Sequence, residues 1–335
     1  MSDPARPAVY PWTAGAWQQL IARRESLPQA LLIHGPRGIG KLELARRFAQ
    51  LILCETAGAT SPCEKCDGCR WFLAGQHPDF RQIEPESMSA SVELPEDAPA
   101  PSKAAKPSQE IKVDQVRELA DFLNIGSHRG KRRLALFHPA EDMNGNAANS
   151  LLKSLEDPAS GACFILISNN PRHLIPTIRS RCISLPVGMP DKAAAIAWIE
   201  QAQVVNAADW LAFAGGAPLL AMDCAQSDRG EQIGQVVGLL RQGGREGLLA
   251  WPATDREHIE ILSEVLQKWA YDQAFASFSG KRRFFSPVSD ELVPTTQKGQ
   301  AWLRFARDAG RYRLAATHPL NPKLFAADLI RKMPG

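Results

Sequence analysis

The stretch Ala30-Leu-Leu-Ile-His34-Gly35-Pro-Arg-Gly-Ile-Gly40-Lys41 decides the fold of the amino-terminal part of this chain. It opens with a short apolar run that predicts a buried strand, and its glycines predict a tight loop. Leu44, Phe48, Leu51 and Ile52 then recur at helical spacing. A strand, a glycine loop and a helix in this order have the form of a P-loop. In such a loop the backbone N–H groups at a helix N-terminus bind phosphate.

The candidate nucleotide-binding residues of this degenerate P-loop are Gly35, Gly38, Gly40 and Lys41. In a hydrolysing P-loop protein the lysine is followed by Ser or Thr, whose hydroxyl holds Mg²⁺. Here the next residue is Leu42, which has no oxygen ligand to offer. The loop is therefore compatible with ATP binding but lacks one part needed for hydrolysis.

A second strand, predicted at Arg133–Phe137, lacks the acidic residues that a hydrolysing site would carry at its end. It is followed by His138-Pro139-Ala140, and Glu141 and Asp142 come several positions late. We interpret these two acids as part of a solvated loop. The sequence thus predicts the shape of an ATPase without its catalysis, and no intrinsic ATPase activity is expected.

Strands alternate with helices over the first half of the chain. A third strand is predicted at Cys163–Ser168, after a helix that carries Leu151 and Leu155 on one face and stops before Pro158. This alternation predicts an α/β fold with a parallel sheet covered on both faces. Beyond about Pro190 only helical spacing remains, so the carboxy-terminal third is predicted to be all-α.

Residues 86–109 interrupt the compact pattern. This stretch is rich in Pro, Ser, Ala and Glu and has no aromatic residue. Such a segment buries too little apolar surface to offset the entropy of ordering it. We therefore predict a mobile surface insertion.

The strongest pattern of metal-ligating residues in the sequence is a cluster of four cysteines: Cys54, Cys63, Cys66 and Cys69. Four thiolates close a tetrahedral zinc site that has no open position for water, so the metal would be structural. Ordinary buried thiols, an iron–sulfur cluster and a redox-active set are the alternatives. Structural Zn²⁺ is the interpretation that we favour.

Composition sets the limits of function. The chain has 335 residues and a net charge of +3, which excludes a strongly basic nucleic-acid-binding coat. No apolar run is long enough to span a membrane, and the start of the sequence has no apolar secretion signal, so a cytoplasmic location is expected. Lys281-Arg-Arg-Phe-Phe285 and Arg129-Gly-Lys-Arg-Arg133 leave open a third hypothesis, a zinc-dependent protein that binds nucleic acid.

Several motifs together resemble those of the delta-prime family of bacterial DNA polymerase III clamp-loader subunits, which are AAA+ proteins. Matching segments cover most of the chain outside the insertion. They are Tyr10-Pro-Trp12, Gln29-Ala-Leu-Leu-Ile33 with its glycine loop, the cysteine spacing with Ala74-Gly-Gln-His-Pro-Asp79, the run from Ala147 to Pro158, Ser180-Arg-Cys182, and His318-Pro-Leu-Asn-Pro322. The cysteine spacing within a P-loop domain and the Ser-Arg-Cys triplet are the specific matches.

The resemblance implies a hetero-pentamer with gamma or tau motor subunits and a delta subunit, which loads a sliding clamp onto primer-template DNA. In it the chain would be non-catalytic and would lend Arg181 in trans to a neighbouring ATP site. The chain would be part of an enzyme only through its membership of the polymerase holoenzyme, which is a nucleotidyltransferase. The alternative is an ATP-hydrolysing motor subunit. The implied domains are an AAA+ domain at 1–187 with the zinc module at 54–69, a small helical lid at 188–228 and a helical collar at 229–335.

Overall fold

The computed structural model describes residues 9–56, 58, 60–89, 107–124, 132–286, 296–316 and 321–334. The chain divides into two compact units, Met1–Met189 and Pro190–Gly335. Among the described residues, no helix has the length and apolar character needed to cross a membrane.

The first unit is built on a parallel sheet of five strands in the order β2-β3-β4-β1-β5. Its strands are β1 (Ala30–His34), β2 (Phe80–Ile83), β3 (Arg133–Phe137), β4 (Ala162–Ser168) and β5 (Ile183–Pro186). The predicted strands at β1 and β3 are confirmed, and β4 begins one residue before its prediction. The α/β class with a parallel sheet is therefore correct.

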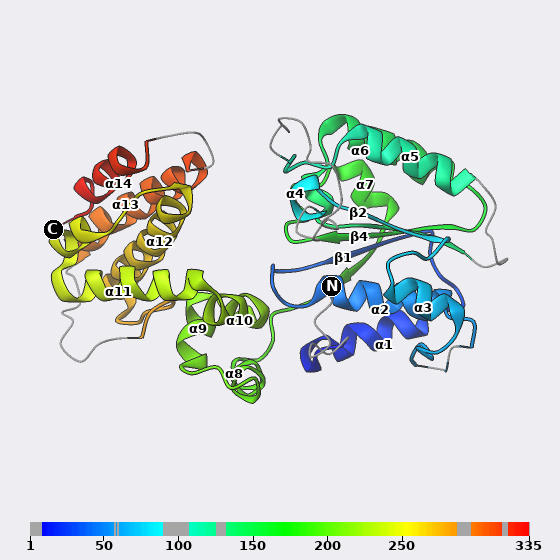
Figure 1. Cartoon of the computed structure of the whole chain (residues 1–335), viewed down its shortest axis with the longest axis horizontal. Coiled ribbons are helices and arrows are strands. Elements are labelled where there is room, and N and C mark those ends of the chain that lie inside the picture. The colour runs from blue at the N-terminus through cyan, green and yellow to red at the C-terminus, as the bar shows by residue number, and fades with distance from the viewer. Residues whose placement is uncertain are drawn as a thin grey trace, which may run out of the picture. The chain divides into compact units, whose positions relative to one another are not determined.

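Helices cover both faces of this sheet (Figure 1). They are α1 (Ala14–Ala22), α2 (Lys41–Leu53), α3 (Asp67–Leu73), α4 (Glu86–Ser89), α5 (Val113–Asn124), α6 (Gly145–Glu156) and α7 (Pro176–Arg181). Figure 1 shows α1 and α2 on one face and α5, α6 and α7 on the other. The apolar residues of β1 alternate accordingly, and Ala30 and Leu32 pack in one core with α5 and α6.

The two ends of the predicted insertion meet at the surface of the first unit. Residues 90–106 lie outside the described residues, so the predicted mobility stays a prediction. At the base, the Ser87 N–H donates to the Ser108 carbonyl at 3.0 Å, and the Ser108 N–H donates to a carboxylate oxygen of Glu86 at 3.0 Å. The insertion thus leaves and re-enters the fold at one point, which lets the sheet form around it.

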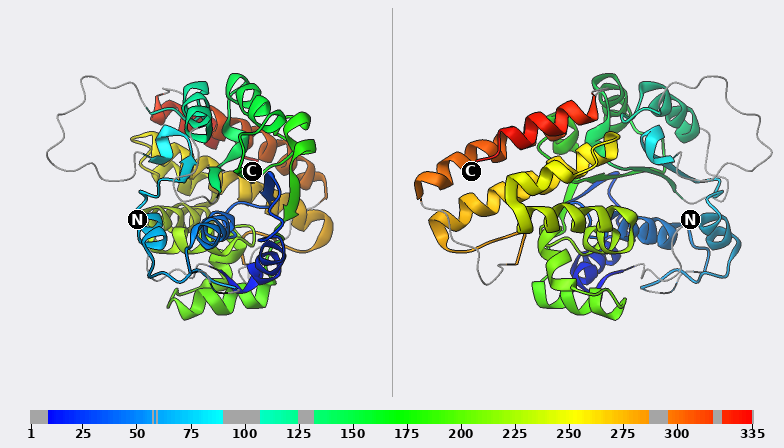
Figure 2. Two further views of the ribbon diagram at one scale, coloured as in Figure 1. Left: turned by 90° about the vertical axis from the view of Figure 1, so that its right-hand side faces the viewer. Right: turned by 60° about the vertical axis from the view of Figure 1, so that its left-hand side comes forward.

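All elements described in the second unit are helices. They are α8 (Lys192–Gln201), α9 (Ala207–Phe213), α10 (Pro218–Gln226), α11 (Asp228–Gly247), α12 (Arg256–Ser279), α13 (Thr296–Ala315) and α14 (Pro322–Arg331), with one 3₁₀ turn, Leu248–Ala250, after α11. Figure 2 shows α12 and α13 running side by side.

The described residues of the second unit form two apolar cores. The smaller joins α8, α9 and α10 through residues such as Ile199 and Leu211. The larger joins α11 to α14 around Trp269 and Trp302, and Phe213 at the end of α9 also belongs to it. Since one compact unit contains both cores, the division into a lid at 188–228 and a collar at 229–335 stays a prediction.

Candidate functional site

The glycine loop connects β1 to α2 and is held from outside by the amino-terminal segment. Gly40 has φ +83° and is the N-cap of α2, a left-handed conformation that favours glycine. A Cβ at Gly40 would lie 2.3 Å from Cδ2 of Tyr10. Tyr10 is fully buried and stacks on Trp12, whose indole N–H donates to the Ile39 carbonyl at 3.0 Å. The Tyr10-Pro-Trp12 motif therefore fixes the end of the loop where the helix begins.

Lys41 lies at the first turn of α2 and points into its own loop. Its ammonium donates to the Pro36 carbonyl and, at 2.9 Å, to Oδ1 of Asn169 at the end of β4. The residue is only 4% exposed, and this burial lowers the pKa of Lys41 to about 8. The structure thus brings Lys41 to the phosphate-loop position, next to the carboxyl ends of β1 and β4, where ligands bind in open α/β sheets.

The parts that would hold Mg²⁺ are replaced by other groups. Leu42 is half-buried and carries no oxygen. At the end of β3, burial lowers the pKa of His138 to about 4, so the imidazole is neutral at physiological pH. A neutral imidazole and a leucine replace the carboxylate and hydroxyl of a hydrolysing site.

Glu141 is not the solvated loop residue that the sequence suggested. It lies in the 3₁₀ turn Ala140–Asp142 and is half-buried. One carboxylate oxygen accepts the N–H of Asn169 at 2.8 Å and the N–H of Asn170 at 3.2 Å. The carboxylate therefore orders the end of β4, next to the amide that binds Lys41. No signal in the sequence connects positions that are this far apart.

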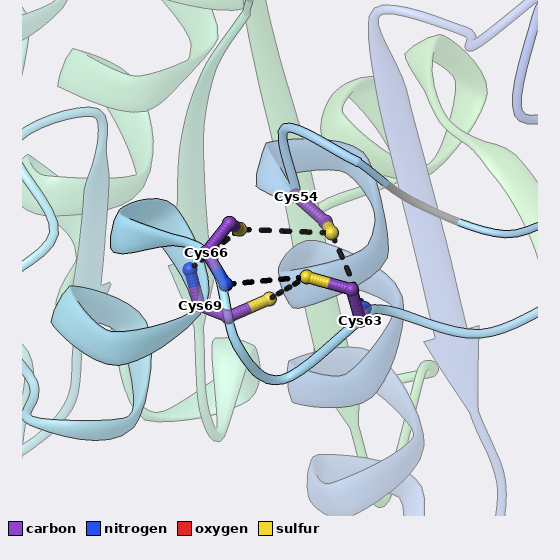
Figure 3. A group of neighbouring side chains, drawn as sticks. All are labelled: Cys54, Cys63, Cys66 and Cys69. Atoms are coloured by element: carbon purple, nitrogen blue, oxygen red, sulfur yellow. Dashed lines mark hydrogen bonds between the residues drawn. The ribbon is translucent and has the colours of Figure 1, made fainter.

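The four cysteines of the sequence motif lie together between the end of α2 and α3, where they could hold a metal ion (Figure 3). All four Sγ atoms lie within 4.8 Å of one another. Cys54 and Cys66 are 3.8 Å apart at sulfur, and Cys63 and Cys69 are 4.0 Å apart. Zinc bound at about 2.3 Å by four sulfurs places them about 3.8 Å apart in a tetrahedron. The cluster fits a closed four-sulfur site.

Backbone N–H groups point at the sulfurs of this cluster, as thiolate ligands require. Cys66 N–H and Lys65 N–H both donate to Sγ of Cys63, and Cys69 N–H donates to Sγ of Cys66 at 3.4 Å. A hydrogen bond from the Thr56 hydroxyl, followed by the backbone ones, lowers the pKa of Cys63 to about 5. These residues would hold the metal, and the metal would tie α2 to α3.

The segment after the cluster connects it to the sheet. The Asp79 N–H donates to Nδ1 of His77, and both side chains are buried. The carboxylate of Asp79 lies 3.5 Å from Nε of Arg133, which is also buried and stacks its guanidinium over the ring of Phe122. A buried ion pair thus joins the Ala74–Asp79 motif to the start of β3. From the sequence, this motif served only as a sign of the family resemblance, and its structural role was not predicted.

Arg181 is the last residue of α7 and is exposed at the surface of the first unit. Its two Nη atoms donate to a carboxylate oxygen of Glu156 at 2.7 Å and to the Thr177 carbonyl at 3.0 Å. The hydroxyl of Ser180 also donates to the Thr177 carbonyl. Cys182 turns inward against the core, and burial raises the pKa of its thiol to about 11. The triplet therefore presents its arginine outward.

The basic-aromatic patch at residues 281–285 is not a stacking platform for bases. Phe285 is 8% exposed and packs against Trp269 and Phe213. The backbone N–H groups of residues 283–285 donate to the buried carboxylate of Asp272. The aromatic residues belong to the core of the second unit. Most of the second patch, 129–131, and most of the 318–322 motif lie outside the described residues.

Comparisons with known proteins agree on one family. A family model described as "DNA polymerase III, delta subunit" matches residues 14–189. The chain is 37% identical over 251 residues to the DNA polymerase III subunit delta' of Pseudomonas aeruginosa. This alignment covers 74% of this chain and 70% of that protein. The corresponding Escherichia coli protein is 28% identical over 65% of this chain and 61% of its own length.

Proteins named for other DNA polymerase III subunits are also similar. The DNA polymerase III subunit tau of Salmonella typhimurium is 30% identical over 53% of this chain and 25% of its own length. A solved Thermotoga maritima protein related to the gamma subunit aligns at 16% identity with a TM-score of 0.46, covering 94% of this chain and 97% of that one. That structural similarity is too low to support a functional assignment. The family model and the Pseudomonas relative both span most of the α/β unit, and the chain belongs to the DNA polymerase III delta-prime family.

Proposed function

We propose that this chain is a non-hydrolysing subunit of the DNA polymerase III clamp loader and supplies Arg181 in trans to the ATP site of a neighbouring subunit. The observation that carries the proposal is the contrast at the two candidate phosphate-binding cations. Lys41 lies in a loop without Mg²⁺ ligands, whereas Arg181 is exposed to any subunit that docks on this edge.

An exposed guanidinium suits this role because it carries its charge at every physiological pH and fits the geometry of a phosphoryl group. Delivered from a neighbouring chain, an arginine stabilises charge on the transferring γ-phosphoryl group and accelerates hydrolysis by roughly 10³–10⁵-fold. Arg181 lies at the carboxyl end of α7, a short helix whose position is fixed by the buried residue Ile178. The helix therefore carries the arginine on a rigid part of the fold.

The other assignments follow from the same family. The motor subunits would hydrolyse ATP, and a delta subunit, the sliding clamp and primer-template DNA would be further partners. The cysteine cluster would hold Zn²⁺, and the four-helix core of the second unit would serve as the collar that oligomerises. Gly35, Gly38, Gly40 and Lys41 would bind nucleotide without turnover.

The test uses the loader assembled from this chain and its motor partners. Arg181→Ala should reduce hydrolysis at the adjacent ATP site by about 10³-fold. Arg179→Ala is the matched control, because Arg179 belongs to the same short helix and donates to the Pro171 carbonyl instead. DNA-stimulated ATPase activity that is equal in wild type and in Arg181→Ala would remove the trans-arginine role.

A motor subunit with altered motifs is the second candidate, and the placement of Lys41 favours it. A motor would need an oxygen ligand at Leu42 and an acidic residue at the end of β3. A leucine and a neutral His138 stand there, and the carboxylate of Glu141 binds two backbone N–H groups through its Oε1. Mg²⁺-dependent hydrolysis by the isolated chain would distinguish this candidate from the first.

A further inference from the structure

Glu156 occupies a place where a carboxylate is locally unfavourable. It is the last residue of α6, and the carboxyl end of a helix carries a partial negative charge. A carboxylate there is repelled by this partial charge, so it is mildly destabilising in an exposed setting. The packing of α6 does not need it, because Leu151 and Leu155 are buried in the core while Glu156 remains exposed. A residue that breaks a local rule without a packing gain points to a role elsewhere.

Arg181 is the partner that compensates this charge. Its Nη2 lies 2.7 Å from Oε1 of Glu156, and its Nη1 donates to the Thr177 carbonyl. The two contacts hold both arms of the guanidinium, one from α6 and one from α7. The side chains of Arg181 and Glu156 nevertheless remain 36% and 49% exposed. An ion pair this exposed contributes little to stability, so holding the fold together is a minor effect of it.

We propose that Glu156 is a positioning residue that holds Arg181 in the orientation in which it meets the neighbouring nucleotide. This inference rests on the proposed trans-acting role of Arg181. A long arginine side chain loses rotamer entropy when it is held in one orientation, and a preformed hydrogen bond removes part of that cost before the subunits meet. The accessible part of the guanidinium stays available for a phosphate. Among the described residues, Arg181 is the hydrogen-bond partner of Glu156, so the carboxylate would act through the arginine.

The Ala147–Pro158 motif thereby gains a second role, because packing explains only part of it. Its apolar members fill the core under the sheet. Its carboxyl end brings Glu156 to Arg181, although the two residues are 25 positions apart in the chain. The Ala147–Pro158 motif and the Ser-Arg-Cys triplet thus act together, since Glu156 ends α6 and Arg181 ends α7.

The experiment compares variants of this chain in the assembled loader. Glu156→Ala should lower kcat for DNA-stimulated ATP hydrolysis roughly three- to tenfold, because small errors in placement reduce the benefit of a catalytic group. The KM for ATP should not change, because ATP binds in the neighbouring subunit. Glu156→Gln should restore most of the rate, since its amide oxygen accepts the same hydrogen bond. Asp114→Ala, which breaks another exposed ion pair of the same unit, should leave kcat as in wild type.

Three results would overturn the proposal. These are an unchanged kcat in Glu156→Ala, a raised kcat, and a Glu156→Gln variant as slow as Glu156→Ala while both isolated chains melt at the wild-type temperature. Arg181→Ala in the same series separates the two claims. If Arg181→Ala is slow and Glu156→Ala is not, only the positioning role fails. If Arg181→Ala is as active as wild type, the proposed function fails with it.

Discussion

The two cations Lys41 and Arg181 differ in their exposure to solvent, and therefore in the ligands that each can reach. Lys41 is 4% exposed, and its own loop and Asn169 accept its hydrogen bonds. Arg181 is exposed at the end of α7, and its described partners are Glu156 and the Thr177 carbonyl. A buried cation can act only on a ligand that enters its own loop, whereas an exposed one can act on a ligand held by another chain. Under the proposed function, this difference would let the chain act on a nucleotide held by a neighbour, although Leu42 gives its own loop no oxygen ligand for Mg²⁺.

The largest expected effect comes from the cysteine cluster, because it would disturb the unit that carries both cations. Cys66→Ser should abolish binding of one zinc ion per chain and lower the free energy of unfolding by at least about 3 kcal/mol. Helix α2 begins at Lys41 and ends one residue before Cys54, so losing the metal loosens the helix that carries the loop. Zinc content by atomic emission and melting followed by circular dichroism measure the two effects.

Cys224→Ala is the control for this prediction, because Cys224 lies in α10, in the second unit. Its zinc content should equal that of wild type. A Cys66→Ser chain that still binds one zinc ion, or that melts as wild type does, would contradict the structural role of the site.

The next effect concerns the glycine loop that carries Lys41. Gly40→Ala should destabilise the first unit by about 2–4 kcal/mol, because it combines a left-handed backbone with a clash against the Tyr10 ring. Gly75→Ala, which has a positive φ in open space, should cost only about 1–2 kcal/mol. Gly145→Ala should be close to neutral, because the added Cβ would meet no neighbouring atom within 4 Å. Urea unfolding measures all three, and equal effects at Gly40 and Gly145 would show that Tyr10 does not hold the loop.

The smallest expected effect concerns the protonation of Lys41. Burial lowers its pKa to about 8, and a bound phosphate favours the charged form, so the pKa is higher in the complex than in the free chain. Affinity for an ATP analogue should therefore be constant below pH 7 and fall as pH rises through 8, by up to about tenfold per pH unit. Titration calorimetry between pH 6 and 9.5 checks this. An affinity that stays level up to pH 9.5 would mean that Lys41 does not contact the phosphates.

The central strands could be predicted from sequence, and the edge strands could not. β1 and β3 are continuous apolar runs because neighbours cover both of their faces. β2 and β5 are the two edges of the sheet, have four residues each and are largely exposed or half-buried. Such short strands carry neither an apolar run nor a clear alternation. Their pairing is decided by the rest of the fold.

The candidate site shows the same division between local and distant information. The loop glycines, Lys41 and the four cysteines could be identified because each set is close together in the sequence and uses residue types suited to one chemistry. Contacts between distant segments were missed. The carboxylate of Glu141 at Asn169, the ion pair of Asp79 with Arg133, and that of Glu156 with Arg181 all depend on how separate elements pack.

The central claim is that the chain keeps the phosphate loop and has lost the chemistry of phosphoryl transfer. The most direct test is hydrolysis of saturating Mg-ATP by the isolated chain, with Lys41→Ala purified in the same way to account for contaminating ATPases. The account predicts that both proteins release phosphate at the rate of the protein-free blank. Mg²⁺-dependent turnover by the wild-type chain that disappears in Lys41→Ala would contradict it and identify the chain as a motor subunit.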